Sequence, residues 1–201
     1  MDESTSFAPL HQLISEFSAL PGIGKKSARR LAYHLLTQPP EKTRKLAESL
    51  LDARERVKQC EVCYAFTEKS PCPVCSSPTR DQQIICVVEK AADQASFENS
   101  GVYKGTYHVL GGCLSPLDGV GPGDLHIPEL VQRVKQHDAK EVILAMGSSA
   151  DAEATALYID RLLQDHSVKR TRLARGIPMG SDLEFVDELT VLRAFEARTG
   201  I

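Results

Sequence analysis

The sequence predicts an α+β protein of several domains: a helical N-terminal domain and a four-cysteine metal knuckle precede an α/β domain with a mostly parallel sheet. Apolar residues recur at helical spacing up to about residue 57, four cysteines follow in two close pairs, and short apolar runs then alternate with helical patterns. A chain of 201 residues, 42% apolar and 25% charged, fits a globular protein of two or three small domains. No apolar run reaches the length of about 18 residues that a membrane-spanning helix needs, so no membrane partner is expected.

Three helices are predicted in the N-terminal part. The first is marked by apolar residues at helical spacing: Leu10, Leu13, Ile14, Phe17 and Leu20. The second is predicted over Lys25–Leu36 and stops at the Pro39-Pro40 pair, because proline breaks a continuing helix. The third is predicted over Glu41–Val57, and we expect it to bury three leucines: Leu46, Leu50 and Leu51.

The segment between the first two helices, Leu20-Pro-Gly-Ile-Gly-Lys25, is typical of a helix-hairpin-helix. Gly22 and Gly24 let the backbone turn sharply, and their N–H groups converge with the start of the next helix on one point, which favours a phosphate oxygen. Four cations occupy the first turns of that helix: Lys25, Lys26, Arg29 and Arg30. Cations there oppose the helix dipole, so they are better explained as phosphate ligands than as helix stabilisers. The simpler alternative is a plain corner between two helices with basic surface residues.

The distribution of charge favours the same interpretation. Residues 21–58 carry ten Lys and Arg against four Asp and Glu, whereas residues 81–201 carry twelve against eighteen. A basic N-terminal part followed by an acidic C-terminal part predicts a polyanionic partner for the former. Phosphate contacts hold nucleic acid without reading its sequence, so sequence-independent binding is expected.

Two Cys-x-x-Cys pairs, Cys60 with Cys63 and Cys72 with Cys75, are separated by eight residues. Each pair places two thiolates on one tight turn, and two such turns close a tetrahedron of sulfurs. The spacing predicts one structural Zn²⁺ per chain, with no open position for water and no catalysis at the metal. Disulfides or a redox Cys-x-x-Cys are the alternatives, but a single redox pair leaves the second pair unexplained.

After Gln83 the pattern changes to one of alternating strands and helices. Strands are predicted over residues 84–88, 107–110, 142–145 and 171–174, and helices over about 91–99, 128–137, 148–165 and 187–198. The continuous apolar run Ile84-Ile-Cys-Val-Val88 is typical of a buried parallel strand. This alternation predicts an α/β domain with a mostly parallel sheet.

Three acids follow predicted strands at their carboxyl ends. Glu89 follows the first strand, and Asp151 and Glu153 follow the third. Ligands of open α/β sheets bind at that edge, where clustered carboxylates can hold Mg²⁺. The alternative is that Glu89 and Asp151 cap the helices that come next. The six histidines form no pair at metal-ligand spacing, and no hydrolase triad is indicated.

Taken in this order, the hairpin, the cysteine knuckle and the α/β domain closely resemble the bacterial RecR family of recombination mediators over nearly the whole chain. Further segments carry the resemblance: Lys26-Ser-Ala-Arg-Arg-Leu-Ala, Leu114-Ser-Pro-Leu-Asp-Gly-Val-Gly, Glu153-Ala-Thr-Ala, Gly176-Ile-Pro-Met-Gly and Leu183-Glu-Phe-Val-Asp. The resemblance implies a helix-hairpin-helix DNA-binding domain over residues 1–58 and a four-cysteine zinc finger over 60–75. It implies a Toprim domain over 84–179 and an acidic C-terminal segment with an assembly helix over 180–201.

Toprim enzymes pair a glutamate after the first strand with an Asp-x-Asp after the third, both serving Mg²⁺. Glu89 matches the first element, but Asp151-Ala-Glu153 departs from the second. The segment Met146-Gly-Ser-Ser-Ala-Asp-Ala also departs from the family's usual Asn-Pro-Thr-x-Glu-Gly. We therefore expect no catalytic residues, and we keep Glu89, Asp151 and Glu153 as a candidate site for a partner or for Mg²⁺.

The resemblance implies a non-catalytic DNA-binding scaffold of recombinational repair that acts with RecO and RecF to load RecA onto single-stranded or gapped DNA. It implies homodimers and ring-shaped homotetramers, and Lys25 and Arg29 as DNA contacts, with Lys26 and Arg30 beside them. A cytoplasmic, nucleoid-associated location is expected, in agreement with an acidic, polar N-terminus unlike a secretory signal. The alternative is a Mg²⁺-dependent Toprim nuclease or primase; a purely protein-binding module leaves the basic segment without a role.

Overall fold

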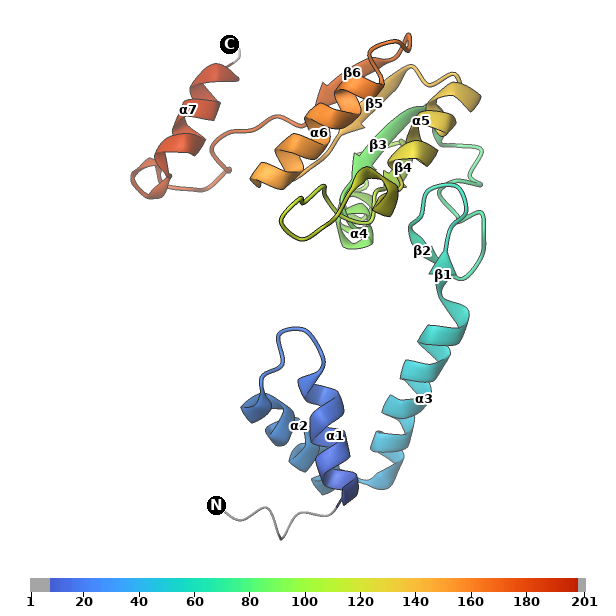
Figure 1. The fold of residues 1–201 in the computed structure, drawn as a ribbon, viewed down its shortest axis with the longest axis vertical. Coiled ribbons are helices and arrows are strands. Elements are labelled where there is room, and N and C mark those ends of the chain that lie inside the picture. The colour runs from blue at the N-terminus through green and yellow to red at the C-terminus, as the bar shows by residue number, and fades with distance from the viewer. Residues whose placement is uncertain (1–7, 199–201) are drawn as a thin grey trace. The chain divides into compact units, whose positions relative to one another are not determined.

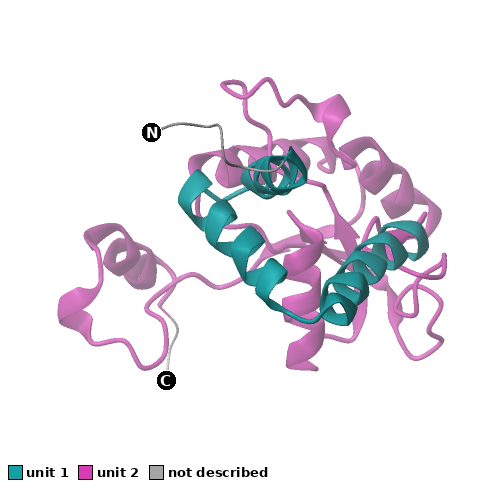
Figure 2. Cartoon of the chain, turned by 90° about the horizontal axis from the view of Figure 1, so that it is seen from below, with its two compact units in different colours: residues 1–57 teal, residues 58–201 magenta. Residues whose placement is uncertain are grey.

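The structure, a computed structural model, describes residues 8–198 and confirms the predicted α+β class (Figure 1). Residues 1–7, which include the acidic N-terminus, and residues 199–201 lie outside the described residues, as do the outer ends of the first and last predicted domains. The chain divides into two compact units, Met1–Val57 and Lys58–Ile201 (Figure 2). Among the described residues, no helix has both the length and the apolar character needed to span a bilayer.

The N-terminal unit consists of three helices: α1 (Ala8–Ser18), α2 (Lys25–Thr37) and α3 (Pro40–Arg56). The hairpin between α1 and α2 contains Gly22 with φ +78°, a left-handed conformation that favours glycine. Helix α3 begins directly with Pro40, where the missing N–H costs no helical hydrogen bond. The predicted helix boundaries are therefore correct to within about three residues.

Few apolar side chains of this unit are covered. Ala28 and Ala32 of α2 are fully buried, whereas neither α1 nor α3 contains a buried residue. The prediction that α3 buries three leucines is wrong for the single chain, because Leu46, Leu50 and Leu51 are 42%, 64% and 63% exposed. Periodicity identifies the apolar face of a helix, but it does not say what covers that face.

The C-terminal unit is built on four parallel strands: β3 (Asp81–Val88), β4 (Gly105–Val109), β5 (Glu141–Leu144) and β6 (Lys169–Arg172). Their order in the sheet is β4-β3-β5-β6, which places β3 and β5 at the centre. The most apolar run of the sequence thus occupies a central strand, where both faces of the sheet are covered.

Helices cover the two faces of this sheet as the alternation of side chains requires. The helices of the unit are α4 (Ala91–Ser100), α5 (Ile127–Gln136), α6 (Ala150–Leu162) and α7 (Glu188–Glu196), with short 3-10 turns at Pro122–Asp124 and Leu183–Phe185. Ile85 and Val87 face one core with α5 and α6, while Cys86 and Val88 face a second core with Phe97 of α4. Alternate residues of β3 therefore serve opposite layers.

The cysteine knuckle lies on the second core, within the same unit. It contains a two-stranded antiparallel pair, β1 (Lys58–Gln59) and β2 (Phe66–Thr67), that the sequence did not reveal. Cys60, Cys63 and Cys72 are buried together with Val109 and Tyr107 of β4. The knuckle is thus packed onto the α/β domain as part of its core.

The outer edge of β4 is closed by hydrogen bonds. The carbonyl of Gly105 accepts from Arg80 at 3.5 Å and the carbonyl of Tyr107 accepts from Arg133 at 2.5 Å. The backbone N–H of Val109 donates to the carbonyl of Cys63 at 2.8 Å. Three of the backbone groups that this edge strand leaves open for pairing are therefore bound by the knuckle and by two arginines.

The C-terminal segment exposes its apolar side chains. No residue of the 3-10 turn Leu183–Phe185 or of α7 is buried. Phe185, Leu189 and Phe195 are 80%, 60% and 66% exposed. Like α3, this segment carries an apolar surface that the described part of the chain does not cover.

Candidate functional site

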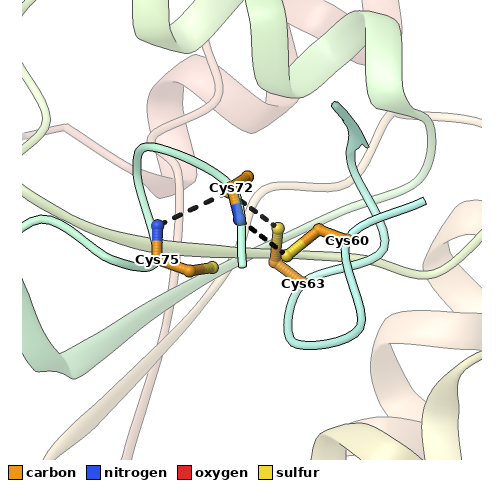
Figure 3. Close-up of side chains that lie close together, drawn as sticks. All are labelled: Cys60, Cys63, Cys72 and Cys75. Carbon is orange, nitrogen blue, oxygen red and sulfur yellow. Dashed lines mark hydrogen bonds between the residues drawn. The ribbon is translucent and has the colours of Figure 1, made fainter. Parts of the chain in front are cut away.

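The four cysteines of the two pairs come together in one cluster (Figure 3). Their Sγ atoms all lie within 4.8 Å of one another, and those of Cys63 and Cys72 are 3.6 Å apart. Tetrahedral zinc with Zn–S distances of about 2.3 Å requires sulfurs about 3.8 Å apart. The cluster therefore fits a zinc ion ligated by thiolates alone, as the spacing predicts.

Backbone amides support the thiolates of this cluster. The N–H groups of Val62 and Cys72 point at Cys60 Sγ at 3.5 and 3.3 Å, and that of Cys75 points at Cys72 Sγ at 3.4 Å. Hydrogen bonds from Cys63 and Cys75 lower the pKa of Cys72, and the hydrogen bonds within the cluster raise the pKa values of Cys63 and Cys75, so without metal the negative charge gathers on Cys72. Thiolates are the form of cysteine that binds metal.

Aromatic stacking adds to the attachment of the knuckle. Tyr64, between Cys63 and Ala65, adopts φ +63° and stacks on the ring of His126 at 3.7 Å between centroids. It also contacts His108 edge to face at 5.5 Å. The zinc turn is therefore wedged against β4 and the start of α5.

A buried histidine and a buried arginine lie behind this contact. Burial lowers the pKa of His108 to about 3, so the ring is neutral, and its Nε2 lies 2.7 Å from the carbonyl of His126. Arg133 donates to the carbonyl of Tyr107 and to Thr106 Oγ1 at 2.5 and 2.9 Å. His108 and Arg133 stabilise the fold, and their spacing in the sequence did not indicate this role.

The first two turns of α2 form a second candidate site. The predicted cations Lys25, Lys26, Arg29 and Arg30 are all exposed there. Within residues 8–198 none of the four makes an ion pair or side-chain hydrogen bond. No acidic residue stands in the first turn, and no side chain caps the helix, whose N-cap is Gly24. Positive side chains and free N–H groups are therefore available to an anion at this helix end.

The hairpin before α2 leaves room for such an anion. A Cβ built on Gly22 or on Gly24 would meet no atom within 4 Å. The backbone on this side is open to close approach by a ligand. The geometry is that of a phosphate site made by a turn and a helix N-terminus.

The three acids at the carboxyl edge of the sheet are held in different ways. Glu89 Oε1 accepts from the backbone N–H of Gly147 at 2.5 Å, so it fixes the loop after β5. The cap of α6 is Ser149, whose Oγ accepts from Ala152 N at 3.1 Å, and the carboxylate that accepts at the start of α4 is that of Asp93. Neither Glu89 nor Asp151 therefore caps the helix that follows it.

Glu153 is bound by two arginines. Arg172 and Arg175 donate to its two oxygens at 2.5 and 2.6 Å, and Arg175 also donates to the carbonyl of Gly147 at 3.0 Å. Hydrogen bonds from Arg172 and then Arg175 lower the pKa of Glu153, so it is ionised at neutral pH. Its negative charge is satisfied within the protein, which leaves it poorly suited to a cation.

Asp151 stays exposed and lines a pocket of about 450 Å³ with Glu89. Asp118, Asp124 and Lys90 line the same pocket. Within residues 8–198, the four cysteines are the only metal-binding cluster of close His, Cys, Asp and Glu side chains. The edge is thus acidic and open, without ligand atoms gathered for a metal.

Four family models match successive parts of the chain. Residues 10–54 match the helix-hairpin-helix of RecR, and residues 57–77 match the four-cysteine zinc finger domain of RecR. Residues 83–174 match the Toprim domain, and residues 176–199 match the C-terminal part of RecR. The zinc finger match covers the cluster that fits zinc, and the hairpin match covers the four cations of α2.

Curated relatives match the chain over nearly its full length. The recombination protein RecR of Desulfatibacillum aliphaticivorans is 48% identical over 195 residues, which cover 96% of this chain and 98% of the relative. The recombination protein RecR of Moorella thermoacetica is 49% identical over 190 residues, with coverages of 94% and 96%. That of Chlorobium limicola is 48% identical over 200 residues, with coverages of 96% and 98%.

Proposed function

The chain belongs to the RecR family of recombination proteins, and from this premise we propose that it is a non-catalytic DNA-binding scaffold of recombinational repair. The observation that carries the proposal is the set of unpaired, exposed cations on the first turns of α2. Lys25 and Arg29, one turn apart on α2, contact phosphates, and Lys26 and Arg30 widen the same surface. Gly22 and Gly24 admit the DNA backbone to the hairpin.

Contacts of this kind bind DNA through charge. Each neutralised phosphate releases counterions, so the affinity falls steeply as salt is raised and does not depend on base sequence. A single hairpin with few phosphate contacts binds weakly. Joining several hairpins in one assembly raises the effective concentration of each, and a ring also slows release of an enclosed strand.

Assembly into homodimers and homotetramers is supported by exposed apolar surface in both units. Leu50 and Leu51 of α3 are 64% and 63% exposed, and Phe185 and Phe195 of the C-terminal segment are 80% and 66% exposed. Apolar groups of this size on water-facing helices are typical of surfaces that another chain covers. A second copy of the same chain is the partner that we propose for both.

The zinc ion has a structural role in this proposal. Four cysteines leave no open coordination position, and the cluster is packed into the core of the α/β domain. When bound, zinc supplies folding free energy and holds the turn that closes the edge of β4. The metal takes no part in any chemical step.

The acidic edge supports a protein partner better than a magnesium site. Glu153 is neutralised by Arg172 and Arg175, and Glu89 is bound to the loop after β5. Phosphoryl transfer needs carboxylates gathered round Mg²⁺.

We propose that the chain works with RecO and RecF in the cytoplasm, at the nucleoid, to promote RecA loading on single-stranded or gapped DNA. The rival function is a Mg²⁺-dependent Toprim nuclease or primase that uses Glu89, Asp151 and Glu153.

Incubation of end-labelled gapped DNA with the protein and Mg²⁺ or Mn²⁺ tests both functions. We expect a mobility shift on a native gel and intact label on a denaturing gel. Shortened label that disappears with Glu89→Gln would establish the nuclease and overturn the scaffold. The absence of any shift at low salt would overturn DNA binding itself.

A further inference from the structure

An exposed aromatic side chain lies next to the cationic surface of α2. Tyr33 is 53% exposed although it follows the fully buried Ala32. Within residues 8–198 it makes no side-chain hydrogen bond and no ring contact. An aromatic ring left half in water, without a partner for its hydroxyl, is available to a ligand.

Helical geometry places Tyr33 on the side of α2 that carries the four cations, further along the helix axis than all of them. At about 100° per residue, Tyr33 lies about 80° round the helix from Lys25, with Arg29 at about 40° between them. Lys26 and Arg30 lie on the other side of Tyr33, at about 100° and 140° round the helix from Lys25. Along the axis Tyr33 is about 12 Å from Lys25, one turn beyond Arg29. The ring thus follows a path of charges that leads away from the hairpin.

We propose that Tyr33 is a base-stacking residue and that it gives this surface a preference for single-stranded DNA. Cations that hold a backbone and an aromatic ring that stacks on a base are the combination by which proteins bind unpaired strands. Bases of an intact duplex are already stacked on one another and offer no face to the ring. The inference rests on the proposed DNA binding and assigns it a strand preference and a further binding residue.

The surroundings of Tyr33 argue against burial under a second copy of the chain. In a symmetric contact whose two-fold axis passes through this face of α2, the four cations of one copy would lie close to the four of the other. The leucines Leu50 and Leu51 on α3 offer an apolar surface without this repulsion. Leu36, three residues beyond Tyr33, is 63% exposed and adds apolar area beside the ring, while the charge of the four cations favours a polyanion with exposed aromatic faces.

Substitutions at Tyr33 test the inference directly. Affinities are measured for an oligothymidine single strand and for a blunt duplex of the same length, at one salt concentration, with the full chain. We expect Tyr33→Ala to weaken single-strand binding about tenfold, within the range for one stacked base, and to leave duplex binding within about twofold. Tyr33→Phe should keep the parent affinities. Tyr33→Leu, which keeps apolar area without an aromatic face, should behave as Tyr33→Ala.

A fluorescence variant gives a second, independent measurement. The chain contains no tryptophan, so Tyr33→Trp introduces a single reporter. Stacking on a base quenches the emission, and we expect quenching by the single strand and little by the duplex. Phe66→Trp, at a position 66% exposed on β2, is the matched control and should not respond.

The outcomes separate this inference from the proposed function. If the parent chain binds neither DNA at low salt, the proposed function fails. If it binds both and Tyr33→Ala weakens them equally or not at all, the stacking role alone is overturned. A drop in the oligomer mass of Tyr33→Ala, with Tyr33→Leu unchanged, would also overturn it, because it would mean that a second copy covers this ring.

Discussion

The cations of α2 and those of β6 and the residues after it differ in what they contact. Lys25 and Arg29 are exposed and have no ionic partner within residues 8–198. Arg172 and Arg175 both donate to Glu153, at 2.5 and 2.6 Å. The first pair is free to bind a polyanion, and the second stabilises the fold.

The cations of residues 169–175 show that a count of charges in the sequence does not distinguish the two regions. It contains four cations, as many as the start of α2, and a count of charges would treat both as basic patches. Yet Lys169 lies 3.7 Å from Glu141, and Arg170 donates to Asp160 at 2.6 Å. Charge density along a chain therefore identifies a binding surface only after the internal ion pairs have been subtracted.

The largest effect should come from the metal that holds the knuckle. We expect Cys60→Ser or Cys72→Ser to abolish zinc binding and to lower the free energy of unfolding of the C-terminal unit by several kcal/mol, since structural zinc contributes on the order of 10 kcal/mol. Metal analysis and thermal unfolding measure the two effects. Cys113→Ser, which alters a half-buried cysteine outside the cluster, is the matched control and should keep one zinc per chain. If the parent protein without metal were as stable as the parent protein with zinc, the zinc assignment would be contradicted.

Charge reversal on α2 should have the second largest effect. It sharpens the comparison of the two cationic regions, because DNA affinity should fall while the stability of the protein stays equal or rises. Lys25→Glu with Arg29→Glu should weaken DNA binding about 100-fold and reduce the slope of log affinity against log salt by about two. The same change should leave the protein equally or slightly more stable, because acids are favoured at a helix N-terminus. Fluorescence anisotropy over a salt series and urea unfolding give the two numbers. Unchanged affinity would mean that the hairpin is a plain helical corner.

Acid should destabilise the C-terminal unit through His108. The pKa of this buried ring is about 3, and that of an unfolded histidine is about 6.5. Between these values only the unfolded chain binds the proton, so the stability is complete above about pH 6.5 and falls as the pH drops. We expect a loss of about 1.4 kcal/mol between about pH 7.5 and 5.5.

The matched variant for this measurement is His108→Gln, which cannot titrate and can still reach the carbonyl of His126. His126, Tyr64 and Arg133 face the ring and are common to both proteins. Urea unfolding in excess zinc, at both pH values, isolates the contribution of the histidine. Equal pH dependence in the two proteins would mean that the ring binds its proton equally well in the folded and the unfolded state, which contradicts a lowered pKa.

The smallest effect should come from Arg175, which follows β6. Arg175→Ala removes one of the two partners of Glu153 and should cost about 1 kcal/mol, as partly exposed ion pairs do. DNA affinity should stay within about twofold, because this cation is already neutralised. Unfolding curves and DNA-binding curves of the parent and of Arg175→Ala test the expected loss of stability and the unchanged DNA affinity. Strong loss of DNA binding without loss of stability would erase the distinction between the two cationic regions.

The sequence was a good guide wherever chemistry is local. The order of the elements, the parallel sheet, the hairpin and the cysteine cluster all follow from periodicity and from the spacing of few residues. The pairing of Glu153 with Arg172 and Arg175 does not, because it joins residues 19 and 22 positions apart across the end of the sheet. The stacking of Tyr64 on His126 was not predicted either, because these two residues are also far apart in the sequence.

The exposed leucines of α3 mark another limit of sequence reasoning. Their spacing is that of a buried face, and Leu46, Leu50 and Leu51 still face solvent in the single chain. A hydrophobic pattern identifies the apolar face of a helix, and it does not say whether a segment of the same chain, a second molecule or solvent meets that face.

The closed edge of β4 has a consequence for the fate of the protein in a cell. The carbonyl of Cys63 accepts from the N–H of Val109, and the turn that presents this carbonyl carries two of the four clustered cysteines. A chain made under zinc starvation would lose the bond from the knuckle and leave only the two arginines on this strand edge, which favours pairing with other unfolded chains. Metal shortage would then remove this protein by aggregation and proteolysis, so zinc supply would set its abundance as well as its shape.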